Sequence, residues 1–138
     1  MQTSKELAVI IPVYNESEII QTVVLEWHKK LSDLKINFVI ALYNDGSKDQ
    51  SLAKMQELKL NNIQVIDKPN SGHGPTIIKG YCEHLDYEWI FQVDSDHEIR
   101  PEDFEKLWNQ RKDYDQSVPR LHSRYSSIPS SPIILSPK

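Results

Sequence analysis

Apolar and polar residues are grouped in segments along the chain. Four short segments are mostly apolar, and each ends in turn-forming polar residues. Strands that are covered on both faces of a sheet show such apolar runs, so the pattern predicts strands near residues 7–13, 36–43, 63–67 and 89–93. Between the strands lie stretches in which apolar residues recur at the spacing of one helix face.

These intervening stretches predict four helices. Ser17 and Ser47 are expected to cap the first and second helices. The third is expected over residues 75–85, and the fourth begins at Pro101, because proline is tolerated in a first turn. Strands alternating with such helices are typical of βαβ units, so we expect an α/β fold with a mostly parallel sheet and helices on both faces.

The composition changes near residue 116. Residues 117–138 contain seven serines and four prolines with little periodicity. Such a segment buries too little apolar surface to offset the entropy cost of ordering. We therefore predict one globular domain over residues 1–115 and a disordered tail over residues 116–138. The apolar patch at residues 133–135 is expected to remain undocked.

The overall composition narrows the class of protein. The 138 residues are 38% hydrophobic and 26% charged, with a net charge of −4, so a nucleic-acid-binding surface is not expected. No apolar run is long enough for a transmembrane helix. The single cysteine, Cys82, excludes an intrachain disulfide and favours a reducing compartment, so the predicted location is the cytoplasm.

Two carboxylates directly follow the fourth predicted strand. Asp94 and Asp96 are one residue apart, and alternation along an extended chain places them on the same side. Like charges this close repel each other unless a cation lies between them, and a hard divalent ion prefers oxygen ligands. Such an ion keeps positions open for phosphate oxygens, so the spacing indicates a metal–diphosphate site. Two acids in an ordinary surface turn are the alternative.

Polar loops also follow the first and second predicted strands, at residues 14–16 and 44–47. In open parallel sheets, ligands bind beyond the carboxyl ends of the strands. The three strand-end loops are therefore expected to share one edge of the sheet. Two simpler explanations stay open, because Glu16 can merely begin a helix and Asp45 can be a turn residue that bonds its own backbone.

With these motifs in view, the chain resembles the N-terminal half of family 2 glycosyltransferases, which have the GT-A fold. The matching segments are residues 9–16, 44–47, 70–74 and 94–96, in the family's order and at its spacing. The likeness is strongest to the branch that includes dolichol-phosphate mannose synthases and related polyprenyl-phosphate transferases. It covers roughly residues 7–114, and four ordered motifs make a chance match improbable.

The resemblance implies an inverting, nucleotide-sugar-dependent transferase. It implies a UDP- or GDP-sugar donor, bound by residues that leave the strand ends: Pro12, Tyr14, Glu16, Asp45 and Asp94. It also implies that Mg²⁺ or Mn²⁺ is held by carboxylates after the fourth strand: Asp94, Asp96 and Glu98. The implied acceptor is a polyprenyl phosphate or a saccharide, and a lipid acceptor would bring the protein to the membrane surface.

The chain departs from the family after the fourth helix. Family members continue well beyond this point, into a half that carries the acceptor platform and the acidic residue taken as catalytic base. Nothing after Tyr114 supplies that base, so the catalytic residue stays unknown. A catalytically inactive, truncated remnant that only binds nucleotide diphosphate is therefore the alternative function. The absent strands would leave a hydrophobic edge at the fourth strand, so self-association is expected.

Overall fold

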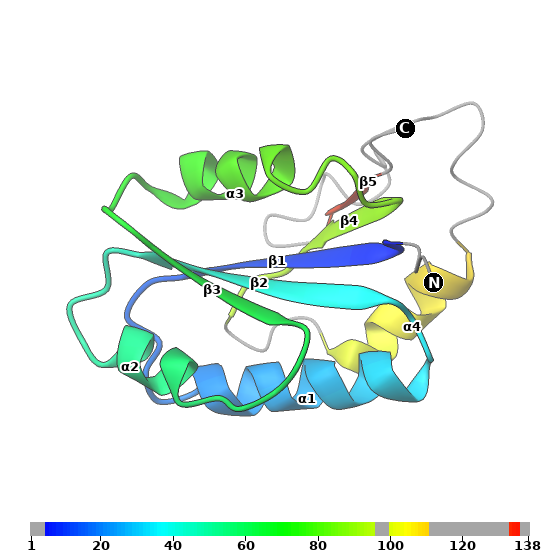
Figure 1. Cartoon of the computed structure of the whole chain (residues 1–138), viewed down its shortest axis with the longest axis horizontal. Coiled ribbons are helices and arrows are strands. Elements are labelled where there is room, and N and C mark those ends of the chain that lie inside the picture. The colour runs from blue at the N-terminus through cyan, green and yellow to red at the C-terminus, as the bar shows by residue number, and fades with distance from the viewer. Residues whose placement is uncertain (1–4, 96–99, 111–132, 136–138) are drawn as a thin grey trace.

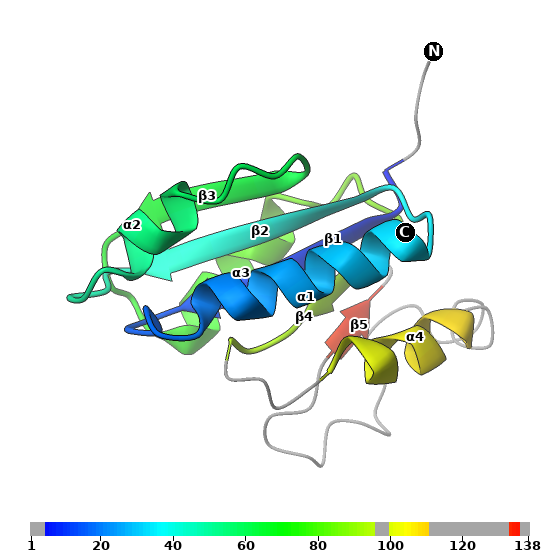
Figure 2. The ribbon, with the colours of Figure 1, turned by 90° about the horizontal axis from the view of Figure 1, so that it is seen from below.

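The computed structural model describes residues 5–95, 100–110 and 133–135. Its centre is a five-stranded sheet in the order β3-β2-β1-β4-β5 (Figures 1 and 2). Four strands run parallel and the last is antiparallel to β4. The strands are β1 (Leu7–Val13), β2 (Phe38–Asp45), β3 (Ile63–Lys68), β4 (Trp89–Gln92) and β5 (Ile133–Leu135). The expected α/β fold with a mostly parallel sheet is confirmed.

Four helices connect and cover the strands. They are α1 (Ile20–Asp33), α2 (Ser51–Gln56), α3 (His73–Cys82) and α4 (Pro101–Asn109). Figure 1 shows α3 alone on one face of the sheet, with α1, α2 and α4 on the other. No helix within residues 5–95 and 100–110 is long and apolar enough to cross a membrane.

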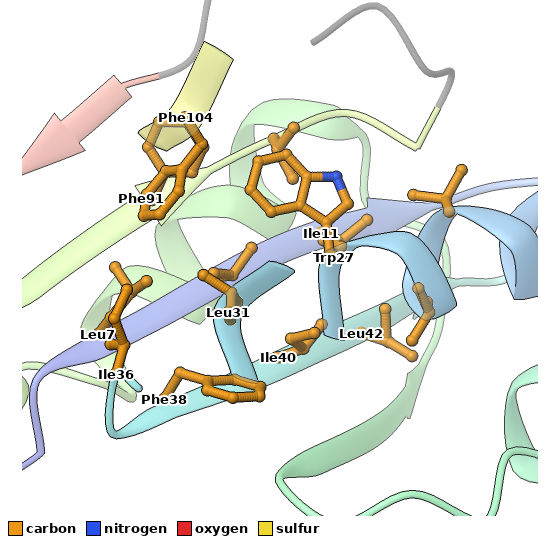
Figure 3. Close-up of a cluster of buried hydrophobic side chains, with 14 of the residues drawn as sticks. Leu7, Ile11, Trp27, Leu31, Ile36, Phe38, Ile40, Leu42, Phe91 and Phe104 are labelled. Carbon is orange, nitrogen blue, oxygen red and sulfur yellow. The ribbon is translucent and has the colours of Figure 1, made fainter. Parts of the chain in front are cut away.

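The two faces of the sheet are packed differently because alternate strand residues point to opposite sides. The face under α1 holds a large cluster in which three aromatic rings meet (Figure 3). The centroid of Phe91 lies 4.8 Å from that of Phe104 and 5.8 Å from that of Trp27. The cluster on the face under α3 has fewer members, with Ala8 and Ala41 beside the larger Ile10 and Tyr43.

A close approach between α3 and the sheet occurs at Gly80. A Cβ atom added there would lie only 2.6 Å from Cγ2 of Ile10 and 3.0 Å from Cε1 of Tyr43. The absence of a side chain at this position therefore lets the helix pack directly on β1 and β2. This contact fixes the position of α3, whose first turn lies at the carboxyl edge of the sheet.

The helix caps expected at Ser17 and Ser47 are wrong. The helices begin at Ile20 and Ser51, and the residue before each makes no side-chain capping hydrogen bond. The Ser47 hydroxyl instead accepts a hydrogen bond from the backbone N–H of Asn15, at 2.9 Å. Because this hydroxyl joins two loops, it is not used to start a helix.

The apolar patch at residues 133–135 also departs from expectation. It pairs with β4, where Ile134 is the register partner of Phe91. The expectation that the patch stays undocked is therefore wrong, and β4 is not an open edge along residues 90–92. The remainder of the proposed tail lies outside the described residues, so its disorder stays a prediction.

Candidate functional site

The order in which the strands are added to the sheet reverses between β1 and β4, although both strands run parallel. It runs outward from β1 to β2 and β3, and then returns to place β4 on the other side of β1. Ligands in open α/β sheets bind at such switch points, beyond the carboxyl ends of the strands. This is the edge at which the loops predicted from the sequence leave the strands.

A cavity of about 360 Å³ lies at this edge. Its walls come from the loops that follow β1, β2, β3 and β4, and its lining residues are Pro12, Val13, Tyr14, Glu16, Asp45, Asn70, Gly72, His73, Asp94 and Ser95. All five residues predicted to bind a donor nucleotide are among them. The structure thus brings these five residues together, and their individual roles stay predictions.

The loop after β1 is tied to the loop after β2. Asn15 has a φ of 56°, which asparagine tolerates better than most residues. Its side-chain Oδ1 accepts the backbone N–H of Lys48 at 2.8 Å. The backbone N–H of Glu16 donates to the Ser51 hydroxyl at 2.8 Å. These bonds tie the two loops together beside the cavity, and Tyr14, which is 44% exposed, lines its wall.

Asp45 is only 4% exposed and is the last residue of β2. Its Oδ1 lies 2.6 Å from Nζ of Lys68. The backbone N–H groups of Ser71 and Gly72 also donate to its carboxylate, at 2.8 and 3.1 Å. Burial alone would raise the pKa of Asp45, but these hydrogen bonds outweigh burial and hold the pKa below its ordinary value.

Asp94 follows β4 and has a side chain that is 23% exposed. Its Oδ1 lies 2.9 Å from Nε2 of His73 and accepts a hydrogen bond from Nε2 of Gln92 at 2.9 Å. His73 is the first residue of α3, whereas Gln92 is the last residue of β4. Within the described part of the chain both of these contacts reach the same oxygen, Oδ1.

The other two predicted metal ligands, Asp96 and Glu98, lie outside the described residues. Asp94 is therefore the one member of the predicted ligand set that can be placed. Over residues 5–95, 100–110 and 133–135, no group of three or more His, Cys, Asp or Glu side chains could hold a metal ion. A carboxylate oxygen beside a cavity suits a hard cation, but a complete ligand shell needs the carboxylates that follow.

A second cavity, of about 500 Å³, lies between α1 and α4. It is larger than the first but contains none of the residues predicted to be functional. Its lining side chains carry both signs of charge, with Lys29 and Arg100 beside Asp33 and Glu102. We therefore place the candidate site at the strand ends, where the predicted residues meet.

Sequence reasoning missed Lys68 and Gln92 as parts of this site. Lys68 matters because it is the register partner of Asp45 across β2 and β3, and register between strands is not visible in the sequence. Gln92 carries a weak signal, since a polar residue two positions before Asp94 lies on the same side of an extended chain.

Comparison with curated proteins gives relatives whose names include undecaprenyl phosphate. The undecaprenyl-phosphate 4-deoxy-4-formamido-L-arabinose transferases of Salmonella choleraesuis (strain SC-B67) and Salmonella newport (strain SL254) are each 30% identical over 107 residues. Each match covers 75% of this chain and 32% of the relative. The chain thus spans about a third of the length of these relatives, whose names fit the predicted polyprenyl-phosphate branch.

Solved structures with a similar fold are glycosyltransferases. TarS residues 1–349 of S. aureus, in complex with UDP-GlcNAc, has a TM-score of 0.64 and 26% identity, and the match covers 79% of this chain and 32% of TarS. A mannosyltransferase from Pyrobaculum calidifontis, in complex with GDP-Man and Mn²⁺, has a TM-score of 0.72 at 12% identity. That match covers 97% of this chain and 45% of the mannosyltransferase, and supports the fold alone.

These likenesses agree with the α/β sheet described above and confirm the GT-A fold expected from the sequence. The family model described as "Glycosyl transferase family 2" matches residues 8–131, which is most of the chain. The protein therefore belongs to glycosyl transferase family 2.

Proposed function

We propose that this chain forms the donor-binding part of a nucleotide-sugar-dependent glycosyltransferase. The observation that carries the proposal is the single cavity in which Pro12, Tyr14, Glu16, Asp45 and Asp94 meet. These residues come from the ends of three strands, β1, β2 and β4. The UDP-GlcNAc complex of the similar TarS domain supports a nucleotide sugar as the ligand.

Each side chain offers chemistry that suits part of such a donor. The exposed ring of Tyr14 can lie against the flat face of a base. The carboxylate of Glu16 can accept hydrogen bonds from ribose hydroxyls. The carboxylate of Asp94 can hold a cation that in turn binds a diphosphate. The buried wall at Pro12 and Asp45 closes the cavity on the side of the sheet.

We include a divalent cation, Mg²⁺ or Mn²⁺, held by Asp94 together with Asp96 and Glu98. When bound, such an ion neutralises the charge that builds on the departing diphosphate. Two or three carboxylates alone make an incomplete shell, so metal binding without nucleotide is expected to be weak. The protein's part is to hold Asp94 in place, which the contacts from His73 and Gln92 do.

For the acceptor we propose a polyprenyl phosphate. The names of the 30% identical relatives support this class. Such a lipid would bring the protein to the membrane surface while its donor site stays in water. A domain that binds the donor without completing transfer is the alternative, and direct measurement of transfer separates the two.

The test is binding calorimetry with UDP- and GDP-sugars, with and without Mn²⁺. One nucleotide class should bind, and binding should require the metal. Asp94→Asn should weaken that binding by at least about tenfold, because the charged ligand to the metal is lost. The matched control is Asp33→Asn, an exposed aspartate on α1, which should bind like the wild type. A folded protein that binds no nucleotide sugar would refute the proposal.

A second assay follows transfer of labelled sugar from the bound donor to undecaprenyl phosphate in detergent micelles. Transfer that disappears in Asp94→Asn supports a complete enzyme. Donor binding without transfer supports the donor-binding alternative for this chain.

A further inference from the structure

A buried ion pair joins the ends of β2 and β3 beside the cavity. Asp45 and Lys68 are register partners in the parallel ladder, so their side chains leave the sheet on the same face. Their side chains are only 6% and 9% exposed, and the charged atoms lie 2.6 Å apart. Buried ion pairs contribute little net stability because both charges lose water. The value of this pair should therefore be sought in what it positions.

Lys68 holds the loop at residues 69–72 through hydrogen bonds from its side chain. Its ammonium group donates to the backbone oxygen of Pro69 at 2.8 Å and to the hydroxyl of Ser71 at 2.6 Å. It also reaches the buried hydroxyl of Thr76 in α3, at 3.2 Å. One cation thus contacts β2, the loop and the first turns of α3. Lys68 does not itself line the cavity.

Asp45 holds the same loop by accepting hydrogen bonds from the loop's residues. The N–H groups of Ser71 and Gly72 donate to the carboxylate, and the Asn70 side chain donates to the backbone oxygen of Asp45 at 2.8 Å. The loop lies so close to the turn after β2 that a Cβ atom added to Gly46 would be 2.7 Å from the backbone nitrogen of Asn70.

The loop leads directly into the residue that contacts Asp94. Gly72 has a φ of +103°, a conformation suited to glycine, and its oxygen accepts the Thr76 hydroxyl at 2.7 Å. The next residue, His73, lies 2.9 Å from Oδ1 of Asp94. A continuous series of contacts therefore runs from Asp45 through Lys68 and the loop to Asp94, and both aspartates line the cavity.

We propose that Asp45 and Lys68 are positioning residues that hold residues 69–72 so that His73 stays against Asp94. In this arrangement Lys68 controls donor affinity without touching the donor, through the placement of His73. Asp45 then acts mainly as an anchor for the loop, in addition to forming the cavity wall. The inference rests on the proposed function for its effect on affinity, but its structural part can be tested without any ligand.

The ligand-free test observes the His73 ring nitrogens by long-range ¹H–¹⁵N NMR at fixed pH. Lys68→Met should shift these resonances, because the loop is released and the contact with Asp94 is lost. Lys68→Arg keeps the charge and should restore them at least in part. The matched control, Lys79→Met, removes a lysine on α3 that pairs with Glu83 and should leave the His73 signals unchanged. Unchanged His73 signals in folded Lys68→Met would overturn the proposal.

The second test is a double-mutant cycle on the affinity for UDP or GDP in the presence of Mn²⁺. Lys68→Met and His73→Ala should each weaken binding by about tenfold, and the double variant should be no weaker than either alone. A roughly hundredfold loss in the double variant would mean independent effects and would refute the series of contacts.

Two outcomes need a further variant or a separate reading: a Lys68→Met protein that does not fold, and a wild type that binds no nucleotide. If Lys68→Met does not fold, the double variant Asp45→Asn/Lys68→Met removes both buried charges and takes its place in the NMR test. If the wild type binds no nucleotide, the proposed function fails, while the His73 resonances still decide whether the positioning contacts exist.

Discussion

Asp45 ends β2, lines the cavity and accepts hydrogen bonds from the loop after β3. A buried carboxylate normally favours its neutral form. Here Lys68 and two backbone N–H groups favour the charged form strongly enough to lower the pKa. The fold therefore gives Asp45 a structural role, and contact with a nucleotide base would be an additional role.

Asp45 should make the stability of the protein depend on pH in the acid range. Its pKa is lower in the folded than in the unfolded chain, so its contribution is complete above the unfolded pKa of about 4 and is lost as the pH falls through the folded pKa. Urea unfolding at decreasing pH should show a smaller loss of stability for Asp45→Asn than for the wild type. Asp33→Asn, on the exposed face of α1, is the control; parallel curves for Asp45→Asn and the wild type would contradict this role.

At the scale of single elements, α3 packs closely on the sheet because Gly80 has no side chain. Gly80→Ala should lower the free energy of unfolding by about 1–3 kcal/mol, because the new methyl group overlaps Ile10 and Tyr43. Helix propensity alone predicts the opposite sign, with a gain of about 1 kcal/mol. Urea unfolding decides between the two effects.

Gly74 provides the matched control for that prediction. It lies in the first turn of the same helix, and a Cβ atom added there would meet nothing within 4 Å apart from its chain neighbours, which include Pro75. Gly74→Ala should therefore create no overlap with the sheet, and its cost should be confined to the local strain of an alanine before Pro75, smaller than the cost of Gly80→Ala. If both alanine variants changed stability alike, the close contact at Gly80 would not be the cause.

The elements also show which features sequence can predict. β1 and the start of α4 follow from local signals, an unbroken apolar run and Pro101, and both are found where expected. The caps at Ser17 and Ser47 were misplaced because the start of a helix depends on which partners a hydroxyl finds in the folded chain. Ser47 finds Asn15, which is 32 residues away in sequence.

The residues of the candidate site likewise divide into those that the sequence predicts and those that it does not. Pro12, Tyr14, Glu16, Asp45 and Asp94 were predictable because each belongs to a motif at a strand end, and parallel strands bring such ends together. Lys68 was not predictable, because its importance comes from its pairing with Asp45 between β2 and β3. Contacts between distant segments determine its role, and these appear only in the folded structure.

At the scale of the whole molecule, the strand order brings β1 and β4 together although many residues separate them in the chain. Figure 2 shows the sheet ending at β3 on one side and at β5 on the other. The second of these edges is where the sequence predicted self-association, because β4 was expected to have no further neighbour. In the structure, residues 90–92 of β4 pair with residues 133–135.

Removing β5 should therefore expose the edge of β4 and increase self-association. A chain that ends at residue 132 lacks the three paired residues, so the N–H and C=O groups along Ile90, Phe91 and Gln92 lose their partners on that side. Unpaired strand edges recruit other strands, and three of the four residues of β4 are apolar. Sedimentation velocity across a concentration series should show more dimer or larger species for this variant than for the full chain. The matched control ends at residue 135, which removes the same end of the chain but keeps β5, and it should sediment like the full chain. Equal sedimentation of the two truncated chains would mean that β5 does not protect β4 from self-association.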